Sequence, residues 1–133
     1  MLLLAPLVVA AVAAGCSDDN PTITNPSNPP AVTETFAGTV TVNGAFAHNF
    51  AVDTPGSVTA QITALGPDAT VTVGFALGTW NGSACQLIIT NDAAKVSTVI
   101  LGTATAPGTL CVRVSDVGQL RAPADYEVRV DHY

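Results

Sequence analysis

The sequence is poor in charge, and above all in positive charge. Its 133 residues include 4 Lys and Arg against 10 Asp and Glu, which gives a formal net charge of −6. Binding to nucleic acid depends on Lys and Arg displacing counterions from phosphates. The composition therefore excludes nucleic acid as the expected partner, and at this length it predicts one folded domain.

Catalytic motifs are also missing. The chain has no Gly-x-Ser-x-Gly elbow, no His-Glu-x-x-His and no phosphate-cradling Gly-rich loop. Only His48 and His132 could activate a nucleophile near neutral pH, and each alternates in register with apolar neighbours, which favours a core-edge position. We expect a non-enzymatic protein with no catalytic residue and no cofactor; a small hydrolase using either histidine is the alternative.

The acidic residues do not form a metal-binding run. Calcium needs six to eight oxygen ligands, commonly from a clustered loop, and no Asp-x-Asp-x-Asp sequence is present. The aspartates beyond the N-terminal region fall in or beside expected turns, where Asp caps backbone N–H groups. We expect no metal site; a calcium ion held by separate loops is the alternative. These aspartates are Asp53, Asp68, Asp92, Asp116 and Asp125.

The first 15 residues read as a secretory signal rather than part of the fold. The run from Leu2 to Gly15 has no polar side chain, and as a helix it would be about 21 Å long, too short for a hydrocarbon core of roughly 30 Å. Its apolar stretch and small C-terminal residues are typical of a cleaved signal. No Lys or Arg precedes the run, so we expect the natural start to lie upstream.

The end of this signal contains a cysteine. The string Ala13-Ala14-Gly15-Cys16 resembles the lipobox of bacterial lipoproteins, in which the Cys thiol is acylated and the preceding peptide removed. The resemblance implies lipidation of Cys16, attachment to a membrane and a location in the bacterial cell envelope, at the outer membrane or the periplasmic or cell surface. An ordinary cleaved signal, with Cys16 as a bystander, is the alternative.

Residues 16–34 form the next compositional block, which is rich in Pro, Asn, Ser and Thr. Proline removes backbone donors, and the short polar side chains compete for backbone hydrogen bonds. The block is therefore expected to be a tether, which at roughly 3 Å per residue could hold a domain some tens of ångströms from the membrane.

Residues 35–133 alternate between polar and apolar side chains with a period of two, as strands with one buried face do. Turn signals separate the runs, and no window predicts an amphipathic helix, although Asp92 to Val96 could form one turn. We predict an all-β fold, a single antiparallel β-sandwich of about eight strands, with jelly-roll and Greek-key connections both open. The expected inward-facing residues are Phe46, His48, Phe50 and Val52; Val58, Ala60, Ile62 and Ala64; Val71, Val73, Phe75 and Leu77; Leu110, Val112 and Val114; and Tyr126, Val128 and Val130.

Two features of this domain are candidate sites. If Cys16 carries lipid, Cys85 and Cys111 remain, and in an exported chain they are expected to form a disulfide. Trp80 lies in an expected turn, where it could stack on a sugar or a peptide, or simply cover the rim of the core. We name Trp80 as the possible ligand-binding residue.

The C-terminal half resembles a known family. The segment from Pro107 to Gly118 and the strand from Asp125 to Val130 look like the closing strands of bacterial pre-peptidase C-terminal (PPC-like) domains, and Phe50 to Val58 is similar to an earlier strand, turn and strand of that family. The resemblance implies a jelly-roll-like sandwich appended to exported proteins.

These features together predict an envelope lipoprotein that displays a non-enzymatic interaction or structural module. Its partner would be an envelope protein or a polysaccharide. A carbohydrate- or polymer-binding module is one alternative, and an accessory domain for an exported hydrolase is another.

Overall fold

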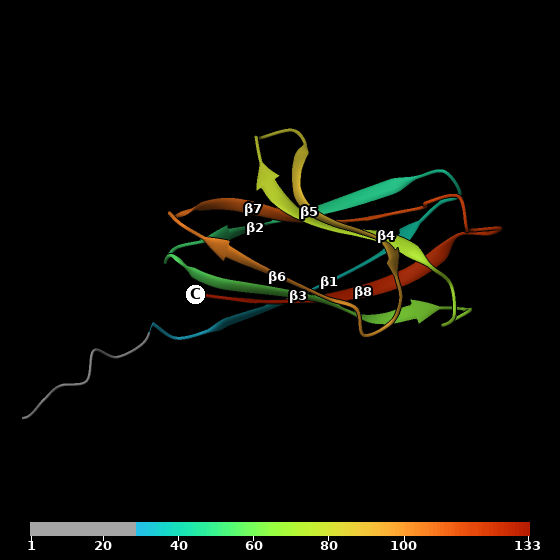
Figure 1. Cartoon of the computed structure of the whole chain (residues 1–133), viewed down its shortest axis with the longest axis horizontal. Helices are drawn as coiled ribbons and strands as arrows, with labels where there is room; N and C mark the ends of the chain where they lie inside the picture. Colours follow the sequence, from blue (N-terminus) through green and yellow to red (C-terminus); the bar gives the residue numbers. More distant parts are fainter. Residues whose placement is uncertain (1–28) are drawn as a thin grey trace, which may run out of the picture.

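The computed structural model describes residues 29–133, which form eight β-strands (Figure 1). The predicted signal 1–15 and the lipidation site Cys16 lie outside this range. Within it no helix is long and apolar enough to cross a membrane. The strands are β1 (Val32–Val40), β2 (Ala45–Val52), β3 (Gly56–Gly66), β4 (Val73–Trp80), β5 (Cys85–Ala94), β6 (Val99–Ala104), β7 (Gly108–Ser115) and β8 (Ala124–His132).

The strands form two four-stranded antiparallel sheets that pack face to face. One sheet has the order β1-β8-β3-β6 and the other the order β2-β7-β4-β5. The pairing is nested, because β1 pairs with β8, β2 with β7, β3 with β6 and β4 with β5. A long hairpin folded in this way is a jelly roll, so the predicted β-sandwich is confirmed and its connections are now assigned.

The core lies between the sheets and follows the predicted alternation closely. In β8 the inward-facing Tyr126, Val128 and Val130 are buried, while Glu127 and Arg129 between them are exposed. Phe50 of β2, Phe75 of β4, and Val112 and Val114 of β7 join the same cluster. In β4, which has a strand on each side, both faces are buried from Val73 to Gly78. Burial of these side chains, at about 25 cal/mol per Å² of apolar surface, drives the packing of the two sheets.

Four local predictions need correction. The composition predicts a tether through residue 34, but β1 already begins at Val32. Ala64 is exposed and Leu65 buried in its place, because a register shift between Ile62 and Ala64 reverses the facing of β3. Two corrections concern expected turns: Asp92 continues β5 rather than starting a helical turn, and Trp80 is the last residue of β4.

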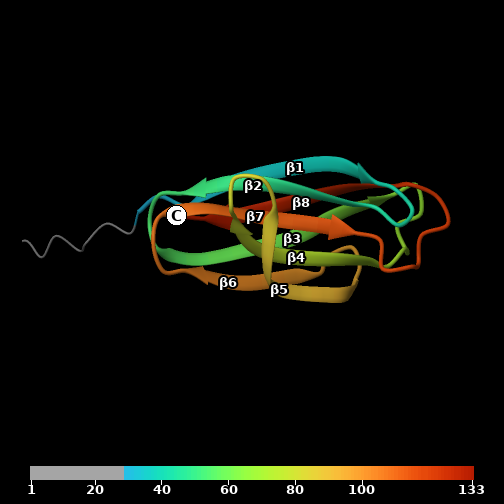
Figure 2. The ribbon, with the colours of Figure 1, turned by 90° about the horizontal axis from the view of Figure 1, so that it is seen from above.

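The two long sides of the sandwich carry different side chains. The edge strands β1 and β2 lie along one side, and β5 and β6 along the other (Figure 2). The β5–β6 side exposes aliphatic residues, with Ile88 69% and Leu101 70% exposed. The β1–β2 side instead carries a group of neighbouring aromatic rings, from Phe36, Phe46, His48 and Phe50.

Candidate functional site

The predicted disulfide between Cys85 and Cys111 is confirmed, and it joins two strands that are not neighbours. Cys85 begins β5 and Cys111 lies in β7, with β4 between them in the sheet. In a flat sheet, strands that flank a third are about 9.5 Å apart, but here the two Cα atoms are 5.7 Å apart. The tip of the β4–β5 hairpin therefore leaves the plane of the sheet on its outer face, as Figure 1 shows.

Gly78 allows this bend. It is paired with Cys111 across β4 and β7, and a register shift with β5 occurs between Leu77 and Gly78. A side chain at Gly78 would run into the backbone carbonyl of Gln86. Cys111 alternates with core-facing Val112 and so points outward, yet it is 0% exposed, because the hairpin tip covers it.

The bent hairpin forms one wall of an open depression of about 550 Å³ on the outer face of the sheet. The floor comes from β2 and β7, where Ala47 lies opposite Arg113. Because the β2 side chains on this face are small, the Arg113 side chain and the indole of Trp80 are not hidden beneath larger neighbours. We call this surface the Trp80 depression; it is lined by Ala45, Phe46, Ala47, Trp80, Ser83, Ala84, Cys85 and Arg113.

The wall that carries Trp80 is fixed at its tip as well as at the disulfide. Asn81 Oδ1 accepts hydrogen bonds from the backbone N–H groups of Ser83 (3.0 Å) and Ala84 (2.8 Å). The Asn81 N–H donates to the carbonyl oxygen of Ala84 at 3.1 Å, and Gly82 takes a φ of 99°, which glycine adopts readily. The depression is therefore largely formed before any partner arrives.

Phe46 links this depression to the aromatic residues of the β1–β2 side. It is 52% exposed, although alternation places it on the inner face of β2. Its ring centroid lies 4.9 Å from that of His48, which in turn stacks on Phe36 at 5.1 Å and 16°. Sequence periodicity correctly predicted the face of Phe46 but not its exposure, which depends on β2 being an edge strand.

His48 lies on the inner face of β2, as predicted, and contacts the β8 tyrosine. Its Nε2 is 2.7 Å from the Tyr126 hydroxyl. Burial lowers the pKa of His48 below 6.5 and raises the pKa of Tyr126 to about 12. Near neutral pH both side chains are therefore uncharged, and the tyrosine hydroxyl can donate to the imidazole nitrogen.

His132 is also on the inner face and is 3% exposed. Its Nε2 lies 2.7 Å from Glu34 Oε1 across β1 and β8, and its Nδ1 lies 3.2 Å from the Tyr133 carbonyl oxygen. Within residues 29–133, no Ser, Thr or Cys side chain is hydrogen-bonded to either histidine. Both predicted candidate bases thus have structural partners, Tyr126 and Glu34.

Three of the five aspartates expected in turns accept hydrogen bonds within residues 29–133. Asp68 and Asp116 cap backbone N–H groups as predicted, and hydrogen bonding lowers the pKa of both. Asp125 instead lies in β8 and accepts a hydrogen bond from Thr39 on β1. Across the part of the chain that is described, no group of three or more His, Cys, Asp or Glu could hold a metal ion.

Comparison with known proteins gives fold relatives only. No family model matches the chain, and no curated protein matches its sequence. Among solved structures, it is similar to Aeromonas hydrophila PliG, a periplasmic lysozyme inhibitor of g-type lysozyme, with a TM-score of 0.51 and 16% identity over 75% of this chain and 85% of that one. It is also similar to the Yersinia pseudotuberculosis-derived mitogen YPM, with a TM-score of 0.53 and 11% identity over 77% of this chain and 85% of that one. At such identities these matches establish a shared β-rich fold, and the PPC-like resemblance stays a prediction.

Proposed function

We propose that this chain is an envelope lipoprotein whose β-sandwich binds another protein through the Trp80 depression and does so without catalysis. The observation that carries the proposal is the grouping of Trp80, Phe46 and Arg113 on one preformed surface. Trp and Arg dominate the binding energy of protein interfaces, and aromatic residues are enriched at interface cores. An open depression suits a protein surface better than a small molecule, which is usually enclosed.

The sequence supports the anchoring half of the proposal. Cys16 follows a signal-like apolar run, and the residues from Cys16 to the start of β1 at Val32 would form the tether. Two or three acyl chains would make the attachment effectively permanent, since each buried CH₂ contributes about 0.8 kcal/mol. The PPC-like resemblance is consistent with an exported protein of this kind.

The fold relatives support the binding half. PliG, which shares the fold, is a periplasmic inhibitor of an enzyme, so a sandwich of this shape can serve as a non-enzymatic module that binds a protein. The histidines of the present chain fit the same interpretation, because His48 and His132 are held by Tyr126 and Glu34.

Anchoring is tested by mass spectrometry of the mature protein and by fractionation of a Cys16→Ser variant. We expect an acylated N-terminal Cys16 in the wild type and release of the variant from the membrane. An unacylated Cys16 in membrane-derived protein would contradict this half of the proposal.

Binding is tested by crosslinking in native membranes, with wild type, Trp80→Ala and Tyr133→Ala compared as baits. Tyr133 is a matched control, because it is a partly exposed aromatic residue that packs beside Gly56, outside the Trp80 depression. We expect one specific protein partner that Trp80→Ala loses and Tyr133→Ala retains. Equal capture by both variants would refute the assignment of this surface.

A polysaccharide is the second candidate partner, because a partly exposed indole such as Trp80 can stack on a sugar ring. Pull-down on envelope polysaccharides distinguishes the two. The carbohydrate-binding alternative would be favoured if the polysaccharide retained the wild type but not Trp80→Ala, and if crosslinking gave no protein partner.

A further inference from the structure

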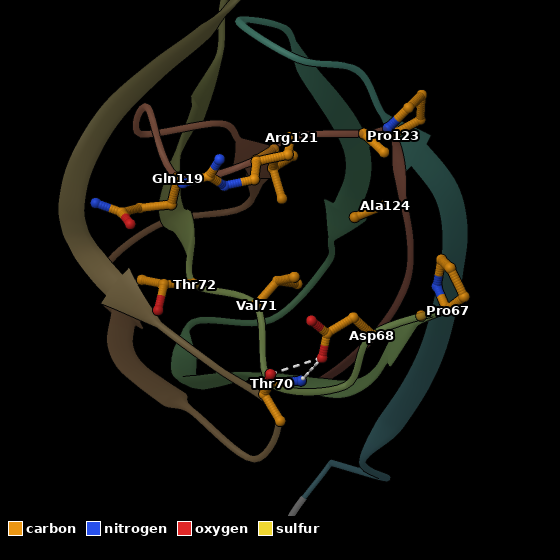
Figure 3. A pocket seen from close by; sticks show the side chains of 12 residues that line it. Pro67, Asp68, Thr70, Val71, Thr72, Gln119, Arg121, Pro123 and Ala124 are labelled. Atoms are coloured by element: carbon orange, nitrogen blue, oxygen red, sulfur yellow. Dashed lines mark hydrogen bonds between the residues drawn. The ribbon is translucent and has the colours of Figure 1, made fainter.

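A second hollow, of about 370 Å³, lies at one end of the sandwich between the β3–β4 and β7–β8 loops (Figure 3). It shares no lining residue with the Trp80 depression. Its volume falls in the range of small-molecule sites. Five polar side chains line it together with several apolar ones; the polar ones are Asp68, Thr70, Thr72, Gln119 and Arg121.

Both loops are held in place by their own hydrogen bonds. Asp116 Oδ1 accepts from the N–H groups of Gly118, Gln119 and Leu120 at 2.8, 3.0 and 3.1 Å. Asp116 Oδ2 accepts from the Asn43 N–H at 2.8 Å, which ties the loop to the β1–β2 turn. On the other loop, Asp68 Oδ1 accepts from the N–H and hydroxyl of Thr70 at 2.8 and 2.6 Å. The backbones of the two loops are thus preorganised, which lowers the part of the entropic cost of binding that comes from ordering the loops.

The polar side chains in the hollow are accessible to a ligand, because Asp68, Gln119 and Arg121 are exposed to solvent. Within residues 29–133, the side chains of Arg121, Gln119 and Thr72 have no hydrogen bond or ion pair, and Asp68 Oδ2 has none either, whereas Arg129 is paired with Asp131 at 3.0 Å. In Figure 3, Arg121 and Gln119 project from the β7–β8 loop, and Asp68 lies across the opening on the β3–β4 loop.

The apolar part of the hollow complements these polar groups. Leu120 is buried and Val71 half-buried, and Pro67 and Pro123 also line the hollow. A ligand with an apolar C–H face could rest on these side chains while its polar groups reached Arg121 and Asp68.

The charges define the ligand further. A guanidinium binds a carboxylate through two parallel hydrogen bonds, and Asp68, whose pKa is lowered by its bonds to Thr70, accepts from hydroxyl groups. A dianionic phosphate would be repelled by Asp68, and a neutral sugar would form no charge-assisted hydrogen bonds with Arg121. We propose that this hollow binds a sugar acid, with its carboxylate on Arg121 and its hydroxyls on Asp68, Gln119 and Thr72.

Calorimetric titration of the mature chain in detergent tests this assignment. The probes are glucuronic acid, glucose and glucose 6-phosphate, and the variants are Arg121→Gln and Asp68→Asn. Arg129→Gln is the matched control, because it removes the same charge from the outer face of β8. We expect glucuronic acid to bind most tightly, and Arg121→Gln to weaken it about tenfold or more while Arg129→Gln has no effect.

The thermal midpoint of Arg121→Gln should equal that of the wild type, because the Arg121 side chain is exposed and unpaired within the described residues. A short oligomer of glucuronic acid shows whether the natural ligand is a polysaccharide or a free sugar acid. Tighter binding of the oligomer indicates an acidic polysaccharide, and equal binding per sugar indicates a free sugar acid. Absence of glucuronic acid binding at millimolar concentration, equal binding to Arg121→Gln, or a preference for glucose 6-phosphate would overturn the proposal. Since no residue is shared with the Trp80 depression, each of these results is independent of the proposed protein partner.

Discussion

Removing the disulfide should weaken the whole fold and loosen the hairpin that carries Trp80. The bond closes a loop between positions 26 apart in sequence. In the chain-entropy description, a loop of this size stabilises the folded state by about 3.5 kcal/mol. We expect the Cys85→Ala/Cys111→Ala variant to lose about that much free energy of unfolding, because its unfolded chain is no longer restricted.

The assay uses the single tryptophan of the chain. Trp80 fluorescence reports the hairpin tip, and far-ultraviolet circular dichroism reports the two sheets, so denaturant titrations with both probes separate local from global unfolding. In the wild type the two transitions should coincide. In the variant we expect a red-shifted Trp80 emission already without denaturant, because the hairpin is then held mainly by Asn81 and the β4 pairing.

Wild-type protein treated with reductant is the control, and it should match the double variant in both probes. A loss of less than 1 kcal/mol, together with an unchanged Trp80 emission, would refute the reasoning that the bond both restricts the unfolded chain and positions the hairpin.

Three further predictions concern single residues. Gly78→Ala should lower the free energy of unfolding by about 1–3 kcal/mol, because the added Cβ would meet the Gln86 carbonyl. Gly108→Ala is the control, since no atom lies near its Cβ, and it should change that free energy by less than about 0.5 kcal/mol. Equal effects of the two variants in chemical denaturation would contradict the bend at Gly78. Burial lowers the pKa of His48 below 6.5, so the stabilisation by neutral His48 should be complete above pH 6.5 and decline as the pH falls through the lower folded-state pKa. The difference in thermal midpoint between wild type and His48→Gln, measured against pH, should show this decline. A difference that does not change with pH would argue against it. Tyr126→Phe removes the hydroxyl that contacts His48 and should cost about 1 kcal/mol, measured by denaturant unfolding at pH 8; a neutral effect would show that this hydrogen bond does not stabilise the fold.

The parts of the fold that sequence predicts well are those with one buried face. In β8, Tyr126, Val128 and Val130 alternate with charged residues, and a sheet packed on one side requires that alternation. The edge strand β5 was harder to identify. In β5 both Leu87 and its neighbour Ile88 are exposed, so the strand has no clean alternation to detect.

The candidate site was predicted only in part, because it depends on contacts between distant segments. The pairing of Cys85 with Cys111 could be predicted, because an exported chain is oxidised and only these two cysteines remain beside Cys16. The position of Trp80, in contrast, depends on the bend at Gly78. No local pattern in β4 predicts that bend. Likewise, Arg113 reaches the same surface only because the register of β2 and β7 sets it opposite Ala47.

The lining of the end hollow shows the same limit. Asp68 and Asp116 were predicted as turn-capping residues, and they are. Arg121 and Thr72 line one hollow although they lie far apart in the sequence. The nested jelly-roll pairing places their two loops side by side, and the sequence of either loop alone does not predict this.

The central claim, that the Trp80 depression is the surface that meets a partner, is tested most directly by site-specific photocrosslinking in native membranes. A photoreactive residue at position 83 would lie in the depression, in place of Ser83, and one at position 57 would lie on the exposed outer face of the other sheet, in place of Ser57. We predict a discrete crosslinked protein from position 83 that disappears when Trp80→Ala is added, and none from position 57. Equal crosslinking from both positions, or a product at position 83 that survives Trp80→Ala, would contradict the account.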